Sequence, residues 1–147
     1  MLKGIDPRLN ADVLGVLRAM GHGDTLIIAD TNFPADALAR ETTHGRLLRM
    51  ENISAADAAE AVMSVFPLDT FVDDWAGHME CPDGAQPVHT EVQAVVAAAE
   101  GRPRPLPQIE RFAFYDVARE AYAVIQSGER RFYGCFMFRK GVIGPEA

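Results

Sequence analysis

The run from Thr25 to Ala29 constrains the fold more than any other part of the sequence. It holds four consecutive apolar residues, and turn-forming residues lie on both sides of it. A short apolar run bounded by turn signals is typical of a strand that is buried on both faces. The glycine-flanked His22 before this strand and Asp30 directly after it are more polar than a buried strand requires. We therefore expect a functional site nearby.

Helical and extended patterns alternate along the rest of the chain. Helices are expected at residues 10–20, 54–66, 90–100 and 114–120, and strands at 26–29, 46–50, 71–72, 121–126 and 132–138. Residues 73–87 read as a long loop, and the prolines of 101–107 indicate an irregular connector. The alternation predicts a three-layer α/β/α sandwich with a mostly parallel mixed sheet. The final hairpin-like pair would add an antiparallel strand at the end of that sheet.

Length and charge limit the classes of function. A chain of 147 residues with 48% hydrophobic content fits one domain, residues 1–147. The formal net charge of −7 argues against binding to nucleic acid or to an anionic membrane surface. No secretion signal or membrane-spanning run is recognisable, so a cytoplasmic location is expected. Cys81 and Cys135 are expected to be reduced thiols.

His22 and Asp30 are the first candidates for chemistry. An imidazole has an ordinary pKa of about 6.5, which suits proton transfer near neutral pH. A carboxylate after a buried strand lies where ligands bind in open α/β sheets. Structural alternatives remain open for both residues. His22 could face the dipole at the end of the preceding helix, and Asp30 could close an Asx turn.

A second group of candidates lies in the C-terminal third. Arg111 and Tyr115 are four residues apart and would share one face if this segment is helical, so that both could reach a single ligand. The alternative is that the nearby aromatic residues fill the core and that Arg111 pairs with a surface carboxylate. Tyr133 precedes Gly134, and a glycine there lets a ligand or a second backbone approach closely.

The other histidines give weaker signals. His78, Cys81 and His89 lack regular zinc-ligand spacing and are expected to be solvated loop residues. Trp75 is expected to pack in the interior, with stacking on a sugar as the alternative. The sequence contains no serine-hydrolase elbow, no phosphate-binding loop and no dinucleotide fingerprint.

A set of short motifs in a fixed order carries a family resemblance. They are Met1-Leu2-Lys3-Gly4-Ile5, Met20-Gly21-His22-Gly23-Asp24, Asp30 with Phe33-Pro34, Pro67-Leu68-Asp69, Arg111-Phe112-Ala113-Phe114-Tyr115, Gly128-Glu129-Arg130, Tyr133-Gly134 and Lys140-Gly141-Val142. Together they resemble the L-fucose mutarotase and D-ribose pyranase family, and residues 111–115 are closer to the fucose branch. The resemblance implies a cofactor-free, metal-independent isomerase that interconverts monosaccharide anomers. It also implies a three-layer α/β/α fold and ring-like homodecamers.

The resemblance also implies residue roles. His22 would be the catalytic acid/base group, and Asp30, Arg111, Tyr115 and Tyr133 would contact the sugar hydroxyls. Cys135 is also expected among the substrate-binding residues, and it stands where the family carries the asparagine of Tyr-Gly-Asn. Asn32 stands where the fucose branch tends to carry histidine. A thiol is a poor substitute for an amide that both donates and accepts hydrogen bonds. These two departures bear on which sugar is used more than on the reaction.

The length of the buried strand separates His22 from Asp30. At about 3.3 Å per extended residue the two would lie roughly 20 Å apart, too far to hold one monosaccharide. Either a bend brings them together, or each site takes His22 from one subunit and Asp30 from its neighbour. Three other classes of function compete, one of which is a purely structural ring protein that would change the anomer exchange of no sugar. Another is a non-catalytic monosaccharide-binding accessory of sugar uptake, and the third is a metal-dependent hydrolase that recruits His22, Asp24, Asp30 and His78.

Overall fold

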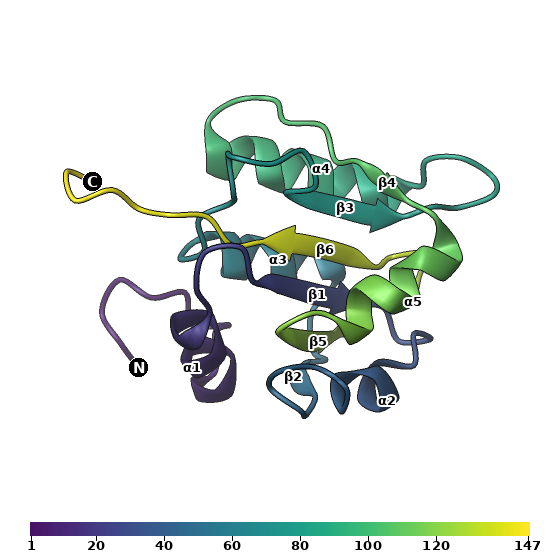
Figure 1. The fold of residues 1–147 in the computed structure, drawn as a ribbon, viewed down its shortest axis with the longest axis horizontal. Coiled ribbons are helices and arrows are strands. Elements are labelled where there is room, and N and C mark those ends of the chain that lie inside the picture. The colour runs from purple at the N-terminus through teal and green to yellow at the C-terminus, as the bar shows by residue number, and fades with distance from the viewer.

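One six-stranded sheet organises the computed structural model, which describes residues 1–147 (Figure 1). Its strands are β1 (Thr25–Ala29), β2 (Leu48–Met50), β3 (Ala76–Met79), β4 (Gln108–Ile109), β5 (Ala123–Ser127) and β6 (Phe136–Arg139). They are arranged in the order β2-β5-β1-β6-β3-β4. The β1–β5, β2–β5 and β3–β4 pairs are parallel, whereas β6 is antiparallel to both β1 and β3. The prediction of a mostly parallel mixed sheet is confirmed.

The antiparallel strand is not at the end of the sheet, so that expectation was wrong. β6 lies between β1 and β3, and β1 separates it from β5. The segment between β5 and β6 is too long for a tight hairpin turn, and it passes the C-terminal end of β1 before β6 begins. Residues 128–135 are therefore held beside Asp30.

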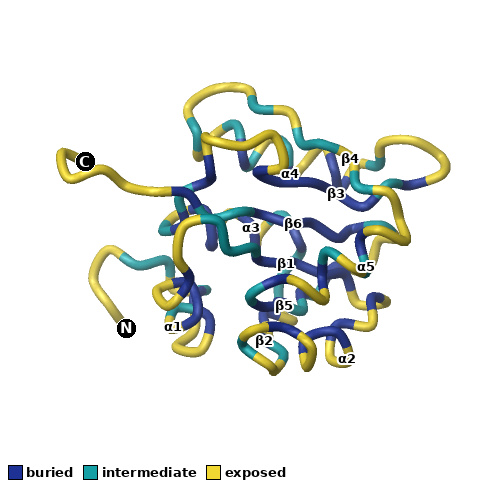
Figure 2. The backbone as a smooth tube through the Cα atoms, viewed as in Figure 1, coloured by how far each residue is buried: buried dark blue, intermediate teal, exposed yellow.

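Helices cover both faces of the sheet. They are α1 (Ala11–Ala19), α2 (Ala35–Ala39), α3 (Ala55–Met63), α4 (Pro87–Glu100) and α5 (Arg111–Arg119). Leu26 and Ile28 of β1 pack in the core shared with α1, α3 and α4. Ile27 and Ala29 point the other way, toward α2 and α5. The predicted double burial of this strand is confirmed, and Figure 2 shows the inner strands as buried.

Capping side chains set several helix starts. Asn10 accepts a hydrogen bond from the Val13 amide, and Ser54 accepts one from the Asp57 amide, as expected of N-cap residues. α4 begins at Pro87, earlier than the expected Thr90, because proline suits the first helical position.

The expected strand at 71–72 and the expected loop at 73–87 both differ from the structure. Residues 71–72 form no strand, and Phe71 is 70% exposed. Strand β3 instead runs through the expected 73–87 loop, with a sequence of Ala, Gly, His and Met that carries no strand signal. It forms because β6 and β4 pair with its two edges. Gly77 lets the Ile109 side chain pack closely there, since a Cβ would lie 2.5 Å from the Ile109 Cδ1 and would force that side chain to move.

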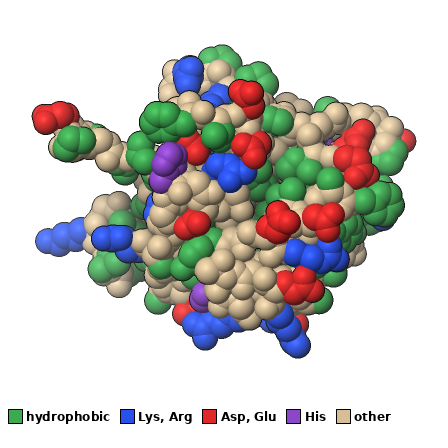
Figure 3. All heavy atoms as spheres, in the orientation of Figure 1, with side chains coloured by type: hydrophobic (Ala, Val, Ile, Leu, Met, Phe, Trp, Pro, Cys, Tyr) green, Lys and Arg blue, Asp and Glu red, His purple; other side chains and the backbone are tan.

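The surface in Figure 3 mixes Lys and Arg side chains with acidic ones. None of the helices combines the length and the apolar character needed to cross a lipid bilayer.

Trp75 is buried with the Arg104 guanidinium 3.8 Å above its ring, which agrees with the packing interpretation.

Candidate active site

A cleft of about 320 Å³ lies at the C-terminal end of β1. It is lined by Asp30, Asn32, Phe33, Met79, Arg111, Tyr115, Phe132, Tyr133 and Cys135. The lining includes all five residues predicted to bind the substrate, and they come from the position after β1, from α5 and from the loop before β6. Few polar groups converge among apolar walls, and the volume is at the lower end for small-molecule sites. The cleft therefore suits a ligand of monosaccharide size.

Asp30 ties together the two segments that form one wall of this cleft. Its Oδ1 accepts hydrogen bonds from the amides of Asn32 and Phe33, both at 2.9 Å. Its Oδ2 accepts one from the Gly134 amide at 3.2 Å. The Asx turn considered as an alternative is thus present, although Asp30 also lines the cleft. Oδ1 already accepts two hydrogen bonds, but Oδ2 accepts only one and has a second lone pair, so Asp30 retains capacity for a ligand hydroxyl.

Helix α5 presents Arg111 and Tyr115 to the cleft from one face. Glu110 starts this helix at the correct place because its carboxylate accepts from the amides of Phe112 and Ala113. The Tyr115 ring stacks on Phe33, with centroids 5.3 Å apart. Arg111 makes no ion pair with a carboxylate, so the surface-pair alternative is not realised. Its guanidinium is free to bind a ligand.

The loop before β6 is held by a buried carboxylate. Glu129 Oε1 accepts from the backbone amide and the Nε of Arg131, at 3.0 and 2.8 Å. The Glu129 backbone carbonyl accepts from the Thr31 amide. A Cβ at Gly134 would come within 2.8 Å of the Glu129 Cγ, so this glycine admits a protein side chain. Tyr133, just before it, has a φ of 61° and is the only non-glycine residue with a positive φ.

Glu129 is expected to make stability sensitive to acid. Its hydrogen bonds with Arg131 lower its pKa from 4.5 to about 2. The stabilisation is therefore complete above about pH 4.5 and is lost as pH falls toward 2, about 2 to 3 kcal/mol in all. Glu129→Gln should lower the free energy of unfolding by about this amount at pH 7, with a smaller difference at pH 3. Urea unfolding at both pH values measures it, with the exposed Glu146→Gln as control; equal losses at the two pH values would contradict it.

Cys135 forms the back of the cleft. Burial and the nearby Asp30 carboxylate raise the pKa of its thiol well above the ordinary value. The sulfur lies 3.4 Å from the Asp30 amide nitrogen, which donates to it. Cys135 is thus a neutral, weakly polar group at neutral pH and adds to the apolar side of the cleft.

His22 lies at the other end of β1 and is paired with a buried carboxylate. Its Nε2 is 3.1 Å from Asp69 Oδ2, and 46% of its side chain is exposed, against 2% for Asp69. The Phe71 ring packs on the imidazole, with centroids 5.4 Å apart. The helix-capping alternative is not realised, because Lys140 Nζ binds the carbonyls of Leu17 and Met20 at the end of α1.

Asp69 is fixed as a charged partner for His22. Burial opposes its ionisation, but hydrogen bonds from the Phe71 amide and His22 outweigh this effect and lower its pKa. Arg104 donates to the Asp69 backbone carbonyl. The pairing leaves Nδ1 of His22 as the nitrogen available to an outside group. The sequence motif included Asp69 but gave no signal of its contact with His22, which is 47 residues away.

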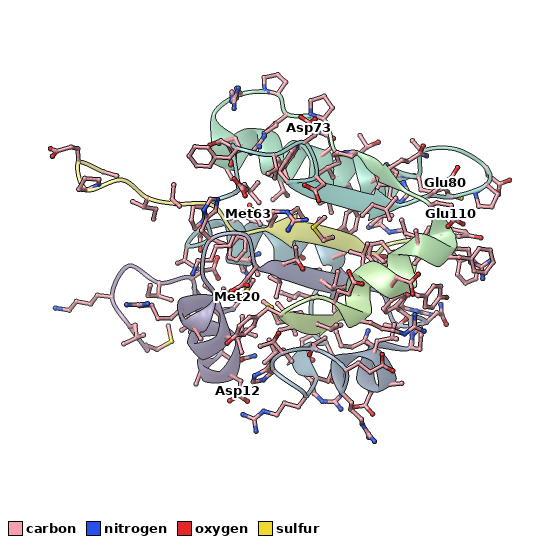
Figure 4. The ribbon with its side chains drawn as sticks, viewed as in Figure 1. Asp12, Met20, Met63, Asp73, Glu80 and Glu110 are labelled. Atoms are coloured by element: carbon pink, nitrogen blue, oxygen red, sulfur yellow. The ribbon has the colours of Figure 1, made fainter.

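The two ends of β1 are separate within one chain. Leu26 to Ala29 pair in unbroken register with β5, and Thr25 to Ile28 pair with β6, so β1 has no bend. Figure 4 shows Met20, next to the His22 loop, on one side of the molecule and Glu110, next to Arg111, on the other. His22 does not line the cleft.

The remaining histidines are not where the sequence predicted. His78, Cys81 and His89 are all buried, so the expectation of solvated loop residues was wrong. His89 lies on α4 and its ring packs edge-on against Phe136 of β6, and the rings of His78 and His89 stack with centroids 4.0 Å apart. No three His, Cys, Asp or Glu side chains converge as a metal site would require. His22, Asp24, Asp30 and His78, which the hydrolase hypothesis requires, therefore do not form such a cluster.

Known proteins match this chain over nearly its whole length. Fucose mutarotase from Homo sapiens is 38% identical over 148 residues, which cover 97% of this chain and 94% of the relative. The crystal structure of protein Atu2016 has a TM-score of 0.95 and 58% identity, covering 98% and 97% of the two chains. The fucose mutarotase of Streptococcus pneumoniae, solved in complex with L-fucose, has a TM-score of 0.86 and 26% identity, covering 97% and 100%.

A family profile gives the same assignment. The profile of the RbsD / FucU transport protein family matches residues 3–143, which include both His22 and the whole lining of the cleft. With this match and relatives at more than a third identity over the full length, the chain belongs to the RbsD / FucU family.

Proposed function

We propose that this protein is a mutarotase that interconverts the α and β anomers of L-fucose or a closely related sugar. The observation that carries the proposal is the pairing of an exposed imidazole with a buried carboxylate, His22 with Asp69, together with a sugar-sized cleft. Relatives at 38% and 37% identity are named fucose mutarotase and L-fucose mutarotase. No cofactor enters the proposed reaction.

The reaction needs one proton donor and one proton acceptor. The ring oxygen of the hemiacetal gains a proton while the anomeric hydroxyl loses one, and the open aldehyde then closes on its other face. His22 is the proton carrier in this scheme, and buried Asp69 stabilises its imidazolium form. Asp30 is the only carboxylate that lines the cleft and is the proposed acceptor. Acid/base catalysis of this kind accelerates reactions by about 10²- to 10⁴-fold.

Apolar side chains in the cleft favour a deoxysugar. Phe33, Met79, Phe132 and Cys135 lie among the lining residues. On C5, L-fucose carries a methyl group where L-galactose carries a hydroxymethyl group, and an apolar wall gives the added hydroxyl no partner. Arg111, Tyr115 and Tyr133 remain to bind the ring hydroxyls.

The site is proposed to be shared between subunits. His22 and the cleft lie at opposite ends of an unbent strand, so one chain cannot bring both to one sugar. Each half of the proposed shared site has an exposed phenylalanine. Phe71 lies beside His22, and Phe132 lines the cleft. Exposed apolar side chains of this size are typical of protein interfaces. The ring-like decamer and the cytoplasmic location stay predictions from the sequence.

Saturation transfer between anomeric protons tests the proposed reaction. We expect added protein to speed the α–β exchange of L-fucose at neutral pH, and to act on L-galactose about tenfold to a hundredfold less well. D-Ribose, L-rhamnose and D-galactose complete the panel. Exchange no faster than in buffer for every sugar would contradict the proposal. Equal rates for L-fucose and L-galactose would contradict the role of the apolar wall.

A sugar-binding accessory protein remains the second candidate. It would use the same cleft but would not need an ionisable group at position 22. His22→Gln would then leave both sugar binding and function unchanged, whereas a mutarotase would keep binding and lose exchange.

A further inference from the structure

A stacked pair of buried histidines lies directly behind the cleft. The ring planes of His78 on β3 and His89 on α4 are 30° apart, and less than one-tenth of the surface of each residue is exposed. His78 points toward α4, so the next residue, Met79, points to the opposite face and lines the cleft. The pair is therefore in contact with the cleft through the backbone of the residues that line it.

Both rings bind carbonyl oxygens of cleft residues. His89 Nε2 lies 2.8 Å from the Tyr133 carbonyl, and His78 Nδ1 lies 3.0 Å from the Met79 carbonyl. A carbonyl only accepts hydrogen bonds, so each of these ring nitrogens must carry a proton. The other nitrogen of His89, Nδ1, accepts from the Gln86 amide at 3.1 Å. His89 is thus held as one neutral tautomer that bridges α4 to the loop before β6.

The residue that His89 holds has an unfavourable backbone conformation. Tyr133 has a φ of 61°, and this conformation is unfavourable for a large non-glycine residue. Contacts with the surrounding residues must therefore stabilise it. Two contacts flank this position: His89 binds the Tyr133 carbonyl, and Asp30 binds the next amide, that of Gly134. Burial lowers the pKa of His89, which keeps the ring neutral at pH 7 and able to make both of its hydrogen bonds.

We propose that His89, backed by the stacked ring of His78, is a positioning residue that holds Tyr133 in its sugar-binding conformation. It acts from the other side of the cleft wall and touches no substrate. The inference rests on the proposed function, since it takes Tyr133 as a contact of the sugar. It adds to that function a residue that the cleft lining itself does not contain.

Two substitutions separate the two hydrogen bonds of His89. In His89→Gln the amide nitrogen falls near the place of Nε2 and can still donate to the Tyr133 carbonyl. In His89→Asn the amide oxygen falls near the place of Nδ1 and can still accept from the Gln86 amide, but the bond to Tyr133 is lost. Both remove the stacked ring, so each is a matched control for the other.

Kinetics of L-fucose exchange then decide the inference. We expect His89→Asn to raise KM about fivefold to tenfold, and His89→Gln to change it less than about twofold, at similar melting temperatures. His89→Asn should have no further effect on KM in a Tyr133→Ala background, because both changes act through one residue. Equal KM values for the Gln and Asn variants, or additive effects with Tyr133→Ala, would overturn the inference.

A second measurement keeps this test separate from the proposed function. If the unsubstituted protein fails to speed exchange of any sugar, the proposed function falls, but hydrogen exchange of the Gly134 amide still reports on the loop. Faster exchange at Gly134 in His89→Asn than in His89→Gln would support the positioning role. Equal exchange rates in the two variants would overturn it.

Discussion

Replacing His22 with alanine is expected to lower the rate of L-fucose anomer exchange by about 10²- to 10⁴-fold, with the fold intact. The side chain is nearly half exposed and its only hydrogen bond goes to Asp69, so little packing is lost. Asp69 keeps its hydrogen bond from the Phe71 amide and remains partly satisfied. The rate is measured by saturation transfer and the fold by circular dichroism.

His22→Gln is the matched control for that loss. Its amide nitrogen can still donate to Asp69, but an amide cannot carry a proton to the substrate. We expect the glutamine variant to bind L-fucose as well as the unsubstituted protein and to be as slow as His22→Ala. Exchange within threefold of the original rate in either variant would remove His22 as the proton carrier.

Asp30→Ala is expected to lose both activity and stability. Three backbone amides, those of Asn32, Phe33 and Gly134, would lose their acceptor. At about 1 kcal/mol for each hydrogen bond, the free energy of unfolding should fall by about 3 kcal/mol, and exchange should slow by at least 10²-fold. Urea unfolding and saturation transfer measure the two effects.

Asp30→Asn separates the two roles of this carboxylate. Its amide oxygen can replace Oδ1 and keep the bonds to Asn32 and Phe33, whereas its amide nitrogen cannot accept from Gly134. We expect about a third of the stability loss but the same loss of exchange, because the proton acceptor is gone. An Asp30→Asn protein with full activity would show that Asp30 serves the fold alone.

Local signals in the sequence were sufficient for much of the fold. The buried strand Thr25–Ala29 and the helix starts at Asn10 and Ser54 depend on residues within a few positions of each other. β3 and the central place of β6 depend on pairing between distant segments. Ala-Gly-His-Met has no strand pattern of its own, so only its neighbours in the sheet could reveal it.

In the candidate site, too, some features follow from local sequence and others depend on contacts between distant residues. The i, i+4 spacing of Arg111 and Tyr115 puts both on one face because α5 begins at Arg111, before the expected helix start at 114. The contacts of Asp69 with His22 and of His89 with Tyr133 span 47 and 44 residues, and no local pattern announces them. The sequence predicts loop residues at His78 and His89, whereas their burial arises from packing against each other and against Phe136 in the folded chain.

The most direct test of the shared site is complementation between two inactive variants. One subunit carries His22→Ala, and the other carries Arg111→Ala with Tyr133→Ala, which remove two polar groups that line the cleft. Expressed together in equal amounts, they should form mixed oligomers in which about a quarter of the sites combine an intact His22 with an intact cleft. We predict that about a quarter of the original L-fucose exchange returns. Activity no greater than the mean of the two separate variants would contradict a site built from two subunits.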